Sequence, residues 1–104
     1  MNFNSLFSTF FIATNFINLM MKEVVEENIR KMEEILKNLK ILDKNALKLY
    51  NLAISYFSDS KYFLEKNDLI RALECITISW AYIDALLHFK LVEIGEKYKK
   101  YFTV

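Results

Sequence analysis

Helix-forming sequence runs without a break from Lys22 to Ile94: this stretch has no proline, and the only glycine of the chain, Gly95, comes directly after it. Proline and glycine are the strongest local signals for turns, so their absence restricts the chain to long helices. Hydrophobic residues make up 54% of the sequence and recur at helical spacing. A chain of 104 residues has room for one domain. The sequence therefore predicts an all-α fold, a small three-helix antiparallel bundle.

Charge and cysteine content narrow the classes of function. The formal net charge of +1 gives no strong field that would attract nucleic acid or an anionic membrane. A single cysteine, Cys75, cannot form an internal disulfide and is typical of a reducing cytoplasm, where we expect the protein to reside. A chain this short buries a small share of its surface. We therefore expect self-association, for example as a homodimer.

The first 21 residues, 1–21, form a leader without charge, because all 14 basic and all 13 acidic residues come later in the chain. The leader lacks the positive start and the small-residue cleavage site of a secretory signal. As a transmembrane helix it would place Asn15 and Asn18 in or near the hydrocarbon region, which argues against a membrane partner. Three interpretations stay open: a membrane anchor, an extra N-terminal helix that covers an apolar groove, and upstream sequence before a start at Met20 or Met21.

The rest of the chain divides into a helical bundle, residues 22–94, and a basic and aromatic tail, residues 95–104. The first helix is predicted from Lys22 to Lys40, with one narrow apolar stripe and one exposed face. Acidic residues on the exposed face stand four positions before basic ones, a spacing that stabilises a helix slightly. These predicted pairs are Glu26–Arg30, Glu27–Lys31 and Glu33–Lys37.

Capping residues mark the breaks between the helices. Asp43 is predicted to cap the second helix. Asn67 tolerates the left-handed conformation that ends a helix, and Asp68 can cap the next one. The third helix, from about Asp68 to Ile94, is apolar on most of its circumference, so we expect it to be buried at the centre and contacted by both others. Gly95 is predicted to end it.

Mostly apolar and aromatic positions of the second and third helices carry a resemblance to a known family. They are Leu49, Tyr50, Ala53, Asp59, Tyr62, Phe63, Leu64, Glu65, Lys66, Asp68, Arg71, Ala72, Glu74, Ser79, Trp80, Ala81, Asp84, Ala85, Leu86 and Leu87. In these positions the segment from Ala46 to Leu91 resembles the archaeal domain-of-unknown-function family 357. The resemblance implies a compact helical bundle of archaeal origin and implies no activity, since packing residues carry it. Asn67 departs from the glycine that is more usual before the aspartate.

Catalytic and metal-binding constellations are missing from the sequence. A cysteine nucleophile needs a base within hydrogen-bond reach, yet the only histidine, His88, lies 13 residues beyond Cys75, roughly 20 Å along a helix. One cysteine and one histidine leave a metal site to carboxylates, and the Glu-x-x-His motif of di-iron bundles does not occur. The sequence therefore predicts no enzyme, no cofactor, and no catalytic or metal-binding residue.

One polar row could still form a small pocket. Trp80, Asp84 and His88 are spaced four and four, so they share one face of the third helix. Tyr56 of the second helix could complete the pocket. The functional interpretation is a site for a small molecule or for a partner's side chain. The alternative is a polar network that fixes helix register, or a strip that faces solvent.

Lysines form the last candidate, a basic patch whose rings and charges could hold single-stranded RNA. The patch comprises Lys37, Lys40, Lys44, Lys48, Lys97, Lys99 and Lys100. From all these observations we predict an interaction or assembly module without catalytic activity, whose partner is a second copy or another protein. A protein associated with nucleic acid through the basic patch is the first alternative. A small-molecule binder around Trp80, Asp84 and His88 is the second.

Overall fold

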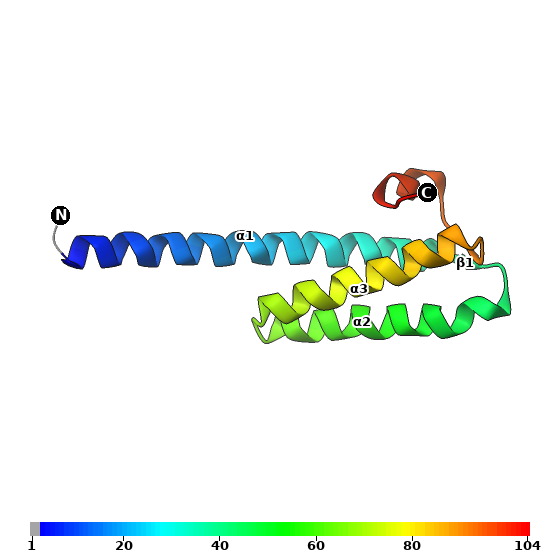
Figure 1. The fold of residues 1–104 in the computed structure, drawn as a ribbon, viewed down its shortest axis with the longest axis horizontal. Coiled ribbons are helices and arrows are strands. Elements are labelled where there is room, and N and C mark those ends of the chain that lie inside the picture. Colours follow the sequence, from blue (N-terminus) through cyan, green and yellow to red (C-terminus); the bar gives the residue numbers. More distant parts are fainter. Residues whose placement is uncertain (1–2) are drawn as a thin grey trace.

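The computed structural model describes residues 3–104, with side chains described from residue 8 onward. Three α-helices follow one another along the chain: α1 (Phe3–Asn38), α2 (Leu47–Glu65) and α3 (Leu69–His88). The remaining elements are two short strands and two 3-10 helices: β1 (Lys40–Ile41), β2 (Val92–Glu93), η1 (Lys44–Ala46) and η2 (Glu96–Tyr101). Consecutive helices run in opposite directions (Figure 1). The predicted all-α class and the small-bundle architecture are confirmed.

Helices α2 and α3 form a close hairpin that packs along the C-terminal half of α1 (Figure 1). Two buried serines lie inside the hairpin, and each hydroxyl donates to a backbone carbonyl of the other helix. Ser79 Oγ donates to the carbonyl of Ala53, and Ser60 Oγ donates to that of Ala72, both at 2.8 Å. Small side chains at these four positions let the two backbones approach. The satisfied hydroxyls then carry little penalty for burial.

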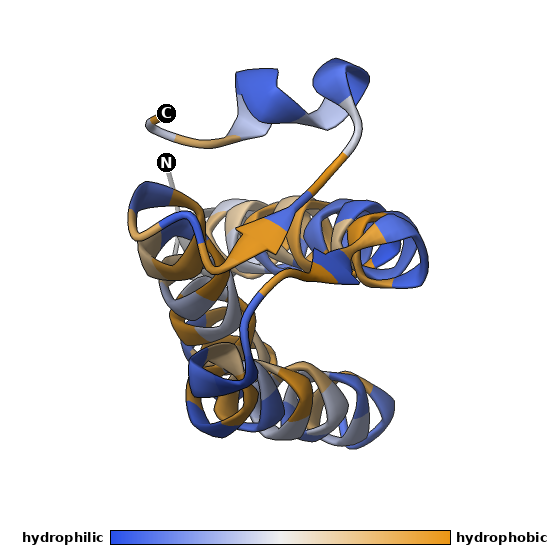
Figure 2. Ribbon diagram, turned by 90° about the vertical axis from the view of Figure 1, so that its right-hand side faces the viewer, coloured by the Kyte–Doolittle hydropathy of each residue, from blue (hydrophilic) through white to orange (hydrophobic). Residues whose placement is uncertain are grey.

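The core lies where the three helices meet, a triangle when viewed along the long axis (Figure 2). The contact of α3 with both other helices, which the sequence predicts, is confirmed. Its burial on most sides is wrong, because the apolar residues Ile70 and Ile78 of α3 are 63% and 37% exposed. Two neighbouring helices cover only part of the circumference of α3, and its outer face meets water. The largest fully buried apolar side chains are those of Met32, Ile35, Ile76, Ile83, Leu86 and Val25.

Helix α1 begins at Phe3 and not near Lys22, so the predicted start of the first helix is wrong. The leader is helical from residue 3, but it continues α1 and forms no separate helix. Nothing between residues 3 and 38 is proline or glycine, and polar side chains inside the helix bond to their own backbone. Thr14 Oγ1, for example, donates to the carbonyl of Phe10 at 3.0 Å. Such bonds satisfy the hydroxyl without breaking the helix.

The helix ends follow the predicted caps at two places and differ at a third. Asp43 accepts from the backbone N–H of Asn45 at 2.8 Å, and it caps η1, which leads into α2. Asn67 has φ 59°, and Asp68 accepts from the N–H of Arg71 at 3.3 Å. The left-handed Asn67 and the cap at Asp68 are confirmed, whereas Asp43 caps η1 and not α2 itself, because α2 follows Ala46 without a side-chain cap.

The third helix ends earlier than the sequence predicts. Helix α3 stops at His88, and Lys90, with φ 57°, takes the left-handed position instead of Gly95. The N–H of Leu91 then bonds to the carbonyl of Leu86, which turns the chain back. This reversal lets β2 pair antiparallel with β1, Ile41 opposite Val92. The pairing of β2 with β1 therefore sets where α3 ends, and the local sequence contains no signal for this pairing.

Candidate functional site

The polar row on α3 holds the end of the chain in place. Asp84 Oδ1 accepts from the backbone N–H of Thr103 at 2.9 Å, and Asp84 Oδ2 accepts from the Thr103 hydroxyl at 2.7 Å. The ring Nε2 of His88 also lies within hydrogen-bond distance of that hydroxyl oxygen. Since the hydroxyl gives its proton to Asp84, it can only accept from His88. A chain of donors therefore runs from His88 through Thr103 to Asp84.

Trp80 extends this attachment with aromatic contacts. Its ring lies 5.0 Å from the ring of Phe102 and 6.2 Å from that of Tyr101, centroid to centroid. Residues 95–104 thus form a strap, the C-terminal strap, that crosses α3 and is held by Trp80, Asp84 and His88. The indole Nε1 of Trp80 is buried and finds no hydrogen-bond partner among the described residues.

Tyr56 stands apart from the row that it was expected to complete. Its ring stacks on that of Tyr82, with centroids 6.0 Å apart and planes inclined by 28°. The residues that complete the row come from the C-terminal strap, which sequence reasoning missed. Tyr101, Phe102 and Thr103 supply two rings and a hydroxyl. Those residue types could have suggested a partner for a tryptophan and an aspartate on one helix face. The hollow beside the row is lined by Thr77, Trp80, Ala81, Asp84, Tyr101, Phe102 and Thr103.

The surroundings of Asp84 favour its charged form. Partial burial acts to raise the pKa of the carboxyl group, and this is the largest single influence. The hydrogen bonds from the backbone and hydroxyl of Thr103, together with the nearby ring of His88, act in the opposite direction and outweigh it. The pKa of Asp84 therefore lies below its ordinary value. A carboxylate fixed in this way is suited to hold the C-terminal strap.

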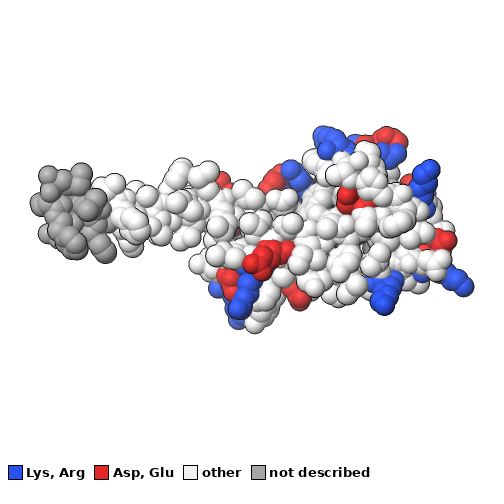
Figure 3. All heavy atoms as spheres, in the orientation of Figure 1, with Lys and Arg blue, Asp and Glu red and all other residues white. Residues whose placement is uncertain are grey.

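The lysines of the basic patch are all exposed, and acidic residues lie among them. Lys40 is opposite Glu93 in the two-stranded sheet. Lys99 Nζ lies 2.6 Å from Glu96 Oε1. On the face of the bundle shown in Figure 3, basic and acidic side chains lie side by side. The seven positions belong to five elements: Lys37 to α1, Lys40 to β1, Lys44 to η1, Lys48 to α2, and Lys97, Lys99 and Lys100 to η2.

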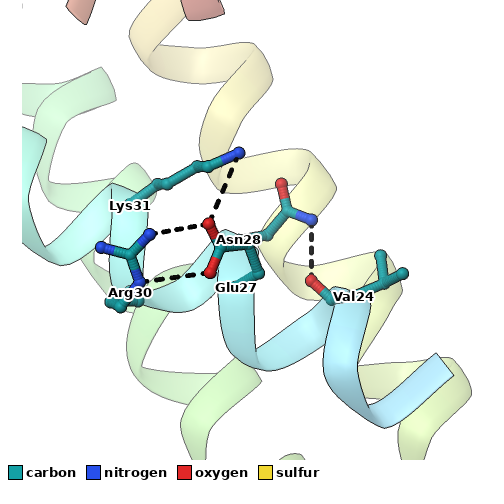
Figure 4. A network of polar contacts seen from close by, with 5 residues as sticks. All are labelled: Val24, Glu27, Asn28, Arg30 and Lys31. Carbon is teal, nitrogen blue, oxygen red and sulfur yellow. Dashed lines mark hydrogen bonds and ion pairs between the residues drawn. The ribbon is translucent and has the colours of Figure 1, made fainter. Parts of the chain in front are cut away.

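A small ionic network lies on the outer face of α1 near the C-terminal strap (Figure 4). Glu27 binds Arg30 at 2.7 Å and approaches Lys31 at 3.8 Å. The hydrogen bond from Arg30, supported by the charges of Arg30 and Lys31, outweighs desolvation and holds the pKa of Glu27 below its ordinary value. Lys31 Nζ also stands 4.9 Å from the ring centroid of Tyr101. Of the predicted pairs, Glu27–Lys31 is confirmed, while Arg30 binds Glu27 rather than Glu26.

Two observations bear on catalysis and metal binding. Cys75 is half-buried, and this burial, with the charges of Asp59 and Glu74, raises the pKa of its thiol. A raised pKa leaves little of the reactive thiolate at neutral pH. Among residues that the structure describes, no cluster of three or more histidine, cysteine, aspartate or glutamate side chains could hold a metal ion.

The N-terminal half of α1 is the most unusual surface of the molecule. Residues 8–21, which we call the arm, extend α1 beyond the α2–α3 hairpin, and the arm is white, without charge, in the space-filling view (Figure 3). Seven large apolar side chains of the arm are between 52% and 72% exposed. They are Phe10, Phe11, Ile12, Phe16, Ile17, Leu19 and Met20. Within residues 3–104, no helix has the combined length and apolarity needed to span a bilayer.

The arm meets the hairpin at one hollow. This hollow lies at the turn between α2 and α3, and it is lined on the α1 side by Asn18 and Met21 and on the hairpin side by residues 66–70. Met21 is the last half-buried residue before the arm becomes exposed on all sides. The hollow thus marks the place where the bundle ends and the arm begins.

Comparisons with known proteins give a family and no activity. No curated protein matches the chain. A crystal structure of a protein from Archaeoglobus fulgidus is similar to this chain with 28% sequence identity and a TM-score of 0.64. The similarity covers 76% of this chain and 99% of that one, and that protein is assigned to the DUF357 family. The model of this family, described as a protein of unknown function, matches residues 22–92, which contain the bundle and exclude the arm. The resemblance seen in the sequence is confirmed: this chain belongs to the DUF357 family.

Proposed function

We propose that this protein is a non-catalytic interaction or assembly module whose contact surface is the arm. One observation carries the proposal: seven large apolar side chains are about half exposed or more on the part of α1 that extends beyond the hairpin. Apolar surface removed from water contributes about 25 cal/mol per Å². Contiguous exposed patches larger than a few hundred Å² generally mark interaction sites. An uncharged arm fits an apolar protein surface better than it fits a phosphate backbone.

The other two candidate surfaces have less support. The polar row on α3 already binds the C-terminal strap through Asp84 and His88, so its polar groups are engaged within the chain. The lysines of the basic patch alternate with Glu93 and Glu96, and alternating signs weaken the field that attracts nucleic acid. The half-buried Cys75 is compatible with a reducing cytoplasm as the place of action.

Affinity capture from native cell extract tests the proposal with the full chain as bait. A variant with Phe11→Lys and Phe16→Lys places two charges on the arm and should lose the captured proteins. The matched control, Ser8→Lys with Asn15→Lys, adds the same charges at polar positions and should retain them. Bound protein and bound RNA are both identified, at low and high salt. Equal capture by the two variants contradicts the arm as contact surface. Capture of RNA that is lost at high salt favours the nucleic-acid alternative.

A further inference from the structure

The apolar face of α1 that packs against the hairpin does not end where the hairpin ends. Inside the bundle this face carries Val25, Ile29 and Met32, all buried. Towards the N-terminus, Met21, Ile17, Thr14 and Phe10 follow at spacings of four and three, which keeps them on the same side of the helix. We call these seven positions the seam. Met21 lines the hollow at the α2–α3 turn, and beyond it the seam is exposed.

The exposed part of the seam can be buried without leaving a polar group unsatisfied. The Thr14 hydroxyl already donates to the carbonyl of Phe10 within its own helix. Nothing in the arm carries a charge, so covering it would strand no ion away from water. A partner for this face must therefore also be an uncharged apolar helix or groove.

We propose that the partner is a second copy of this chain, with the two arms packed antiparallel along their seams. This inference rests on the proposed function and names the partner for the arm. The arm is itself an uncharged apolar helix, so a second copy supplies the kind of partner that this face requires. With the first turns of α1 before the arm included, the helix from Phe3 to the hollow at Met21 measures about 27 Å, so two overlapping segments of this length meet each other's hairpin turns. The free end of one arm then reaches the hollow beside Ile70 of the other copy.

Antiparallel packing is the direction that the fold permits. In a parallel pair, α1 of the partner would continue along the seam into the space that the hairpin fills beside Val25, Ile29 and Met32. In an antiparallel pair each bundle lies beyond the free end of the other arm. Beyond the hairpin turn, the partner's arm then packs on the same side of α1 that α2 and α3 cover within the bundle.

The area at this contact is sufficient for a specific dimer. Phe10, Phe11, Ile17 and Ile70 are between 58% and 72% exposed. With aromatic side chains of about 150–250 Å², these four residues offer on the order of 500 Å² per copy, and a specific interface needs about 1,000 Å² in total. The arms would therefore form a dimer of moderate affinity and not an obligate one.

Sedimentation of the purified full chain over a range of concentrations tests this inference. The wild-type protein should reach a dimer, and Ile17→Lys should weaken self-association by about a hundredfold or more, because it buries an unpaired ammonium group. Ile12→Lys is the matched control: it makes the same change on the opposite face of the arm and should leave the dimer intact. A monomeric wild-type chain, or equal effects of the two substitutions, overturns the inference.

Spin labels measure the direction of the pair. A label at Lys22→Cys, in a chain with Cys75→Ala, lies at the base of the arm. Two such labels should be about 30 Å apart in the antiparallel dimer, because each stands ten residues from the two-fold axis near residue 12. A parallel pair would bring them to about 10 Å, the distance between packed helix axes, and this result overturns the inference.

The two proposals can fail separately. If the pure protein is a monomer but its arm captures another protein from extract, the second copy is wrong and the interaction module stands. If the chain stays monomeric and floats with vesicles of neutral phosphatidylcholine, the arm binds lipid and the inference is wrong. If the pure protein is monomeric and capture is equal for the arm variant and its control, both proposals are wrong.

Discussion

The two halves of α1 are one continuous helix with opposite surroundings. The C-terminal half buries Val25, Ile29 and Met32 against the hairpin and turns a charged face with Glu27 and Arg30 to water. The N-terminal half, the arm, has apolar residues on most sides, and its residues 8–20 are all exposed. Within the bundle, the sequence of α1 matches the protein's own interior. In the arm, the sequence of α1 is equally apolar, but seven of its large side chains stay at least half exposed.

This difference shows what sets the length of the buried seam. Helix α1 has 36 residues, whereas α2 and α3 have 19 and 20. The hairpin can therefore cover only about half of α1, and its turn at Asn67 fixes where cover ends. Beyond that point α1 stays helical because its residues favour helix, but the hairpin no longer packs against it. Helix propensity and tertiary burial are thus separable along one element.

Replacing an isoleucine in each region should give the largest contrast. Ile83→Ala empties a fully buried site of α3 and should lower the free energy of unfolding by about 2–5 kcal/mol. Ile12→Ala removes the same atoms from the exposed outer face of the arm and should change it by less than about 0.5 kcal/mol. Urea denaturation of both variants, at one protein concentration, measures the difference. Equal losses would mean that the arm belongs to the cooperative core.

Asp84→Asn should have an intermediate effect. The side chain of Asp84 is 27% exposed and accepts two hydrogen bonds from Thr103. An amide oxygen can accept, but its NH₂ group cannot replace the second acceptor, so we expect a loss of about 1 kcal/mol. A change in Trp80 fluorescence should accompany it, since the C-terminal strap covers that ring. Asp59→Asn, at an exposed position of α2, is the control. Unchanged stability together with loss of a bound partner would make the polar row a binding site.

The same carboxylate gives a pH dependence of known sign. Because the pKa of Asp84 is lowered in the folded protein, its contribution is fully present above its ordinary pKa, near pH 4. The contribution is lost as the pH falls through the lowered value. The stability difference between the wild-type protein and Asp84→Asn should thus be constant from pH 7 to about pH 5 and shrink towards pH 2. A difference that grows in acid would contradict the lowered pKa.

Local chemistry decided which features could be predicted. The caps at Asp43, Asn67 and Asp68 depend on a side chain and its own nearby backbone, so sequence alone locates them. The attachment of Thr103 to Asp84 joins residues 19 positions apart, and the early end of α3 at Lys90 depends on pairing of β2 with β1. Contacts of this kind have no local signal. The helical arm could have been predicted, since no proline or glycine separates it from the rest of α1.

Glu27→Ala should show the smallest effect, and it tests the charged half of α1. Glu27 binds Arg30 and lies near Lys31, yet about half of its side chain is exposed. Exposed ion pairs are screened by water and salt and gain little when formed. The denaturation midpoint should therefore stay within measurement error of the wild-type value, both at low salt and at 1 M salt. A clear loss at low salt that disappears at high salt would show instead that the network organises Lys31 against Tyr101 of the C-terminal strap. The charged face of α1 would then act in packing, and the contrast between its two halves would be less sharp.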